Sequence, residues 1–185
     1  MVYFSILLET VELDFIVTPL YNLHVKGFAS FGDWKYDDNV LTKVFDESLN
    51  LVSEEVQDVK GGRVGDAAQT NLGLGVVFYV TDNFSIDTDF RYYNKLYANR
   101  VVKDNVELPD YNLVDLGRNY NMNLGEGNMN VRLNVNNIFS QVYIADLSTA
   151  NHVEPGDVTY RGINVNDQGY FGNGRTWNFS MRYNF

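Results

Sequence analysis

The sequence predicts an all-β chain of antiparallel strands with one face turned to lipid, and three observations predict it. The last strand alternates large apolar side chains with polar ones, several strands carry charges that need water on one face, and short connections alternate with long ones. Alternation at period two places successive side chains on opposite faces of a strand. We therefore expect a segment of an antiparallel up-and-down transmembrane β-barrel.

The composition excludes several classes of function. The 185 residues carry a formal net charge of -10 and no cluster of Lys and Arg, which argues against nucleic acid as a partner because phosphate binding needs such clusters. Cysteine is absent, so disulfides and thiolate sites are excluded. The mean hydropathy of -0.25 and the lack of a long apolar run exclude a transmembrane helix. The hydropathy criterion does not apply to barrel strands, since only every second residue of such a strand contacts lipid.

Residues 1–10 are an N-terminal segment whose role the sequence leaves open. The apolar run Ile6–Leu8 lacks a preceding basic region and a small-residue cleavage site, so it is not a signal peptide. An exported barrel needs such a peptide, and we expect the natural start to lie upstream of Met1. The same segment also alternates, which leaves an additional strand possible.

The barrel portion is expected over residues 11–185, and its first strands follow a regular plan. Residues 11–18 alternate apolar with mostly polar side chains, and Pro19–Asn22 supplies a tight turn. Residues 23–36 form the next strand and end in two aromatic residues. The acidic, glycine-closed stretch 37–66 is then expected to be a long loop.

The middle strands repeat this plan with more charge. Residues 67–80 and 84–97 alternate on either side of a short turn at 81–83, and the second of them sets Asp87, Asp89 and Arg91 on one face. Charges in a row on one strand face require water. A medium loop at 98–110 follows.

The last strands are expected at 111–122, 129–139 and 175–185, joined by a glycine-containing turn at 123–128 and a long loop at 140–174. The large side chains of the final strand share one face, which we assign to lipid or its interface. These lipid-facing residues are Trp177, Phe179, Met181, Tyr183 and Phe185.

The connection lengths give the strands an orientation. Outer-membrane barrels have short periplasmic turns and long extracellular loops, and their strands need roughly 9 to 11 residues to cross. If Phe185 ends at the periplasmic side, every short turn falls on that side. About seven strands emerge, whereas such barrels close with an even number. The chain is therefore either a fragment of a larger barrel, which we favour, or a small complete barrel, a porin or structural protein, with an eighth strand in residues 1–10. A soluble β-sandwich binding module is the third alternative.

Two motifs carry a family resemblance. The run Asn134–Phe139, followed by Tyr143 and Ile144, and the run Gly174–Phe185 resemble the C-terminal end of TonB-dependent outer-membrane receptors. Residues 11–34 and 65–70 are similar to such receptors from the Bacteroidetes group. Two positions depart from the family: Ser140 replaces a frequent Asp, and Gly117–Asn119 interrupts a strand and puts its register in doubt.

The resemblance implies that this chain is the C-terminal part, about seven strands, of a 22-stranded barrel in the outer membrane of a Gram-negative bacterium. The full-length parent would import a scarce nutrient, such as a ferric siderophore, haem, cobalamin or a glycan. Its partners would be outer-membrane lipid, the barrel-assembly machinery, an extracellular ligand, and TonB through an N-terminal plug. Nothing in this sequence resembles that plug.

No catalytic, cofactor or metal site is expected. The sequence has no nucleophile elbow, phosphate-binding loop or dinucleotide fingerprint, so we do not expect an enzyme. His152 shares a loop with Glu154 and Asp157 but lacks the spacing of known metal motifs, which favours solvated loop residues. Loops carry most binding function. The loop aromatics proposed to touch a ligand are Phe45, Tyr160, Tyr170 and Phe171.

Overall fold

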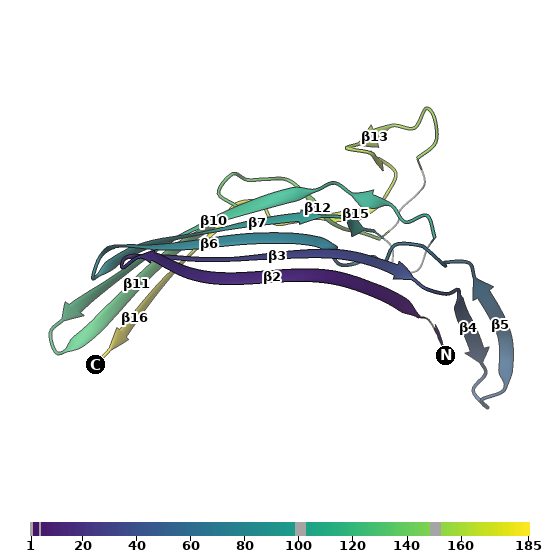
Figure 1. Cartoon of the computed structure of the whole chain (residues 1–185), viewed down its shortest axis with the longest axis horizontal. Helices are drawn as coiled ribbons and strands as arrows, with labels where there is room; N and C mark the ends of the chain where they lie inside the picture. The colour runs from purple at the N-terminus through teal and green to yellow at the C-terminus, as the bar shows by residue number, and fades with distance from the viewer. Residues whose placement is uncertain (1, 4, 99–102, 149–152) are drawn as a thin grey trace.

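The computed structural model describes residues 2–3, 5–98, 103–148 and 153–185. Its main feature is one seven-stranded antiparallel sheet in which neighbours in the chain are neighbours in the sheet (Figure 1). The strands are β2 (Ile6–Leu20), β3 (Leu23–Tyr36), β6 (Thr70–Thr81), β7 (Phe84–Asn94), β10 (Tyr111–Leu124), β11 (Gly127–Asn136) and β16 (Thr176–Asn184). The predicted fold class, all-β with antiparallel strands in a large sheet, is confirmed.

Short strands gather at one end of this sheet, the right-hand end of Figure 1. They are β1 (Val2–Tyr3), β4 (Val40–Phe45), β5 (Leu51–Gln57), β8 (Leu96–Tyr97), β9 (Glu107–Leu108), β12 (Ile144–Leu147), β13 (Thr159–Tyr160), β14 (Ile163–Asn164) and β15 (Gly169–Phe171). The expectation of one long loop over 37–66 is therefore incomplete, because β4 and β5 form a hairpin within it. We call this the loop end of the sheet.

The two-residue turns between long strands all lie at the opposite end, which we call the turn end (Figure 1). They are Tyr21–Asn22, Asp82–Asn83 and Gly125–Glu126. The last is tighter than the turn expected over 123–128, because Asn123 and Leu124 still pair with Asn128 and Gly127. Long and short connections are thus segregated by end, as the sequence predicts.

Cross-strand register gives the sheet an apolar face. In one row, Phe179 pairs with Leu133 and Leu133 with Arg118, and the row continues through Ile86 and Phe78. Apart from Gly27, Thr70, Thr88, Asn94, Asn112 and Arg118, this part of the face is formed by apolar and aromatic side chains. The apolar face comprises Val11, Leu13, Phe15, Val17, Val25, Ala29, Phe31, Leu72, Leu74, Val76, Phe78, Phe84, Ile86, Phe90, Val114, Leu116, Tyr120, Met122, Met129, Val131, Leu133, Val135, Trp177, Phe179, Met181 and Tyr183.

The opposite side, the polar face, is rich in carboxylates, amides and hydroxyls. Its polar members are Glu12, Asp14, Lys26, Ser30, Asn71, Ser85, Asp87, Asp89, Arg91, Asp115, Asn119, Asn121, Asn130, Arg132, Asn134, Asn178, Ser180 and Arg182. The strand alternation that the sequence predicts is therefore present over the whole sheet.

The register around Gly117 is continuous, so the expectation of an interrupted strand is wrong. Gly117 pairs with Asp87 on one side and Asn134 on the other, and its neighbours keep the same register. A Cβ atom at Gly117 would collide with the carboxylate of Asp87. The glycine therefore makes room for that carboxylate to lie across β10 rather than breaking the strand.

The described residues before Val11 contribute to two elements and add no eighth strand to the large sheet. Val2–Tyr3 pairs with β4, and Ile6–Thr10 is the beginning of β2. Among the strands described, β2 and β16 each pair on one side only, so the sheet has two open edges. No second sheet is recorded against either face in the described chain, which contradicts the β-sandwich alternative.

The small protein core lies at the loop end. One buried cluster joins Leu96, Leu108 and Ile144, and another joins Tyr36, Val40 and Val59. Gln69 is fully buried, and its side chain bonds the backbone N–H and C=O of Trp34 at 3.0 and 3.1 Å. The described residues include no helix long and apolar enough to cross a membrane.

Candidate functional site

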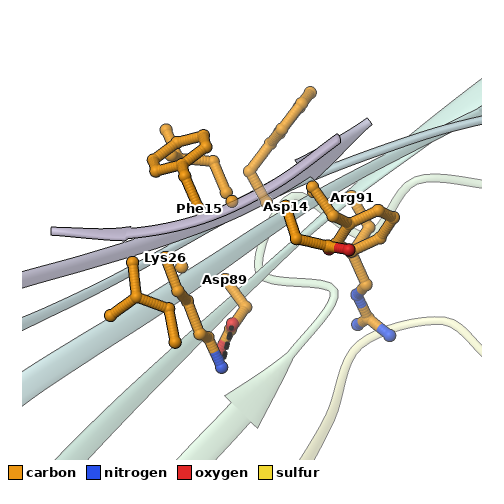
Figure 2. Close-up of a pocket in the computed structure, with 12 residues that line it drawn as sticks. Asp14, Phe15, Lys26, Asp89 and Arg91 are labelled. Carbon is orange, nitrogen blue, oxygen red and sulfur yellow. Dashed lines mark ion pairs between the residues drawn. The ribbon is translucent and has the colours of Figure 1, made fainter. Parts of the chain in front are cut away.

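Ion pairs form a band across the middle of the polar face. Lys26 Nζ lies 3.4 Å from Asp89 Oδ1, and Figure 2 shows this pair on the side of the sheet opposite Phe15. Arg91 pairs with Asp115, which also accepts the backbone N–H of Asn137 at 2.8 Å. These half-exposed pairs stabilise the sheet weakly, each by about 1 kcal/mol or less. Their importance is chemical, because they neutralise the cations of this band.

A third ion pair and a series of amides continue the polar face toward the chain's end. Arg132 Nη2 donates to Asp87 Oδ1 at 2.8 Å. Asn130 Nδ2 donates to Asn119 and Asn121 at 2.7 and 2.6 Å. Further along, β11 and β16 are joined by the bond from Asn134 Nδ2 to Asn178 Oδ1 at 2.9 Å. Such a wall suits a water-filled space.

Closer to the loop end, the polar face is hollowed and aromatic. Eight residues line a hollow of about 360 Å³, and we call the six with the larger side chains the shelf: Glu12, Asp14, Phe28, Trp34, Asn71 and Tyr93. Trp34 is held in place because its Nε1 donates to Thr10 Oγ1 at 2.8 Å. Alternation alone places these residues on one face, but only the cross-strand register brings them together.

Beside the shelf, a second hollow of about 450 Å³ lies where Gly27, Gly73 and Gly75 thin the sheet. Figure 2 shows side chains around it on both sides of the strands, with Phe15 on one and Lys26 and Asp89 on the other. A space lined from both faces is not a single binding cavity. We therefore do not treat it as a site.

Three tyrosines lead from the shelf into the long final loop. The rings of Tyr93 and Tyr111 have centroids 5.0 Å apart, and Tyr111 stacks on Tyr143 at 4.1 Å. Gly172 allows this stack, because a Cβ there would occupy the position of the Tyr143 ring. The aromatic surface of the shelf is thus continuous with the loop end.

The final loop folds around a pocket of about 240 Å³. Three of the four aromatics predicted to contact a ligand, Tyr160, Tyr170 and Phe171, line it together with Ile144 and Ile163. The fourth predicted residue, Phe45, lies apart, at the exposed end of β4. Ligand contact by all four residues stays a prediction.

The residues predicted to face lipid lie together and point outward. Trp177, Phe179 and Met181 expose 73%, 58% and 64% of their surface, and Tyr183 follows on the same face. Phe185 lies just beyond the end of β16. Large apolar side chains that are exposed at successive positions of one strand face indicate that this face is covered by an apolar medium or partner in the functional protein. Contact with lipid itself stays a prediction.

The described residues contain no group of three or more His, Asp or Glu placed to hold a metal ion. His152 lies outside the described residues. Its neighbours in sequence form a local turn, in which the Glu154 N–H donates to Asp157 Oδ2 at 2.9 Å. His24 lies edge-on to Tyr79 on the polar face, with ring centroids 5.3 Å apart.

Ionisable groups at the loop end have shifted pKa values. Burial, and then the charge of Glu107, raises the pKa of the Tyr97 hydroxyl. A hydrogen bond and the charge of Asp58 raise the pKa of Lys103, whose Nζ lies 2.7 Å from that carboxylate. The ion pair between Lys103 and Asp58 ties the loop after β5 to the loop before β9.

No protein-family model matches the sequence. The fold is similar to the crystal structure of the siderophore receptor PiuA from Acinetobacter baumannii, with a TM-score of 0.64 and 14% sequence identity. At this level of identity, the similarity shows the fold alone. It covers 95% of this chain but 21% of the receptor, so the chain spans about a fifth of that protein's length. The similar protein is a receptor and not an enzyme.

Proposed function

We propose that the chain is the C-terminal part of the barrel of a TonB-dependent outer-membrane receptor, whose full-length parent imports a scarce nutrient. The observation that carries the proposal is the combination of a two-faced sheet with segregated connections. One face is apolar, the other carries charged and polar side chains, and all short turns lie at one end. Barrels of the outer membrane combine these features, with short turns in the periplasm and long loops outside.

Strand direction supports a fragment rather than a complete barrel. The seven strands alternate in direction, so β2 and β16 both run from the loop end to the turn end. Pairing β2 directly with β16 around one barrel axis, within one chain or between copies, would therefore be parallel. An all-antiparallel barrel instead needs an odd number of additional strands between these edges. When these seven strands are subtracted from a parent barrel of about 22 strands, the number of strands that is left is odd.

The other assignments follow from the same proposal. The protein is located in the outer membrane of a Gram-negative bacterium related to the Bacteroidetes, with lipid against the apolar face and the barrel-assembly machinery needed for insertion. TonB acts through an N-terminal plug outside this sequence. The nutrient is a ferric siderophore, haem, cobalamin or a glycan. Residues 11–185 form the barrel portion in this proposal.

Spin labelling tests the proposal directly, because the native chain has no cysteine. Single cysteines at 177 to 182, each carrying a nitroxide, are measured in lipid vesicles for collision with oxygen and with a water-soluble nickel complex. We expect oxygen contact to peak at 177, 179 and 181, and nickel contact at 178, 180 and 182. Equal collision rates at neighbouring positions would refute a lipid-facing strand.

The small complete barrel is the second candidate, and the open edges and the strand directions oppose it. Paired cysteines replacing Leu13 on β2 and Phe179 on β16 distinguish the two. A disulfide formed within a monomer would show that these edges meet and would favour the complete barrel. In a fragment, the two thiols stay reduced in the monomer.

A further inference from the structure

The shelf is built from one row of cross-strand partners and the positions next to it. Glu12 pairs with Ser30, Ser30 with Asn71, and Asn71 with Tyr93. The neighbouring row adds Asp14 opposite Phe28. Two carboxylates of the edge strand therefore face the same hollow as the aromatic rings of β3 and β7.

The carboxylates of the shelf lack a basic partner in the described chain. The cations nearest in the sheet register are already neutralised, since Lys26 pairs with Asp89 and Arg91 with Asp115. Neither Glu12 nor Asp14 takes part in any ion pair within the described ranges. The shelf is thus a patch of negative charge without a basic partner, on a wall where Lys26, Arg91 and Arg132 are each paired with a carboxylate.

The aromatic members of the shelf complement a cation as well. Phe28 exposes 41% of its surface to the hollow side, and Trp34 and Tyr93 are half-buried. The face of an aromatic ring carries negative potential and attracts ammonium groups, most strongly in Trp. The hollow of about 360 Å³ falls within the size range of small-molecule sites.

We propose that the shelf binds a positively charged organic group, an amine or quaternary ammonium, of a ligand in the barrel. The proposal deepens the proposed function, since it names the charge of the ligand that the receptor's inner wall accepts. The carboxylates attract the cation, the rings cover its alkyl surface, and Asn71 offers a hydrogen bond. An anionic group at the same place would meet two like charges.

The tyrosine rings extend the aromatic surface beside the shelf. Tyr143, Tyr111 and Tyr93 present successive rings from the final loop to the hollow. Stacked rings cover each other's faces, so only the faces left open are available to a cation. The unpaired carboxylates lie at the shelf end of this series.

Fluorescence of Trp34 tests the proposal. The chain has two tryptophans, and the Trp177→Phe variant leaves Trp34 as the sole reporter. The 185-residue chain, folded in neutral detergent micelles, is titrated with choline chloride, with maltotriose and with citrate. We expect a saturable change with choline alone, weakened severalfold when sodium chloride rises from about 0.05 to about 0.5 M, because salt screens exposed charges.

A charge-matched pair of variants provides the control. The double variant Glu12→Gln/Asp14→Asn is expected to bind choline about tenfold more weakly. It removes the two negative charges that attract the cation and leaves only the aromatic rings to hold it. The variant Asp82→Asn/Glu126→Gln removes the same charge at two short turns and is expected to bind as the parent does. Circular dichroism of each variant verifies its β-structure.

Three results would overturn the proposal: no saturable response to choline, equal binding of maltotriose or citrate, or choline binding that both salt and the shelf variant leave unchanged. A misfolded shelf variant leaves the salt and ligand comparisons decisive. These measurements use micelles and need no outer membrane. If choline does not bind, the spin-label result still tests the membrane-spanning strand. If the spin-label test fails, choline binding to the shelf can still be measured.

Discussion

Substituting Arg for Phe179 tests the lipid-facing assignment at a position near the middle of the final strand's apolar band. This band runs from Trp177 to Tyr183, a length of about 20 Å along the strand. An arginine at the bilayer midplane costs about 2 to 4 kcal/mol. Phe179 also exposes 58% of its surface outward, so its lost transfer to lipid adds about 1 to 2 kcal/mol. We expect Phe179→Arg to lower the free energy of unfolding by about 3 to 6 kcal/mol.

The matched control is Asn178→Arg, one residue away on the polar face. That change loses the hydrogen bond of 2.9 Å from Asn134, which is worth about 0.5 to 1.5 kcal/mol, and places the new charge in water. The assay is denaturant unfolding of the chain in phosphatidylcholine vesicles, followed by tryptophan fluorescence. Equal destabilisation by the two substitutions would show that the two faces meet the same solvent, and the reasoning would fail.

Three further predictions follow from single residues. Arg118→Leu is expected to stabilise the vesicle-bound chain by about 2 to 4 kcal/mol, because Arg118 lies on the apolar face between Ile86 and Leu133. A loss of stability in the same unfolding assay would contradict this prediction. Gln69→Ala removes the acceptor of the Trp34 N–H, at a cost of about 1 to 3 kcal/mol, while the Trp34 carbonyl keeps its bond from the Val64 N–H. The variant is expected to speed limited proteolysis of loop 58–69, whereas a Gln57→Ala control at an exposed glutamine is not. The raised pKa of Tyr97 contributes stability that is present below the ordinary value of about 10 and is lost as pH rises through the folded value. The loop end is therefore expected to lose stability as pH rises above about 10, and Tyr97→Phe is expected to weaken this dependence in denaturant unfolding followed at several pH values.

Strand positions were predictable where alternation is uninterrupted. The expected strand 23–36 matches β3 (Leu23–Tyr36), because its apolar and polar positions alternate up to two closing aromatics. The turn expected at 123–128 was too long. Asparagine and glycine favour turns, but Asn123 and Asn128 lie on a hydrated polar face and bond each other across the strands at 3.3 Å.

The loop-end hairpin and the shelf were harder to predict, for different reasons. The acidic composition of 37–66 favoured a loop over the strands β4 and β5. The turn between these strands is fixed by Asp46, which accepts the backbone N–H groups of Ser48 and Asn50 at 2.9 and 2.8 Å. The shelf combines residues from four strands. Its members share a face by alternation, but their proximity depends on register between strands, which local sequence patterns do not determine.

The distribution of buried apolar residues shows which solvent this fold requires. Nearly all buried hydrophobic side chains of the described chain lie at the loop end, in the clusters around Leu108 and Val40. Along the long strands, large side chains such as Trp177 and Val11 stay exposed at 73% and 70%. A sheet without a protein core gains its hydrophobic stabilisation only from an external apolar medium. We therefore expect the loop end to keep local structure in water while the seven-stranded sheet forms only with lipid or detergent, a difference that hydrogen exchange in the two solvents measures.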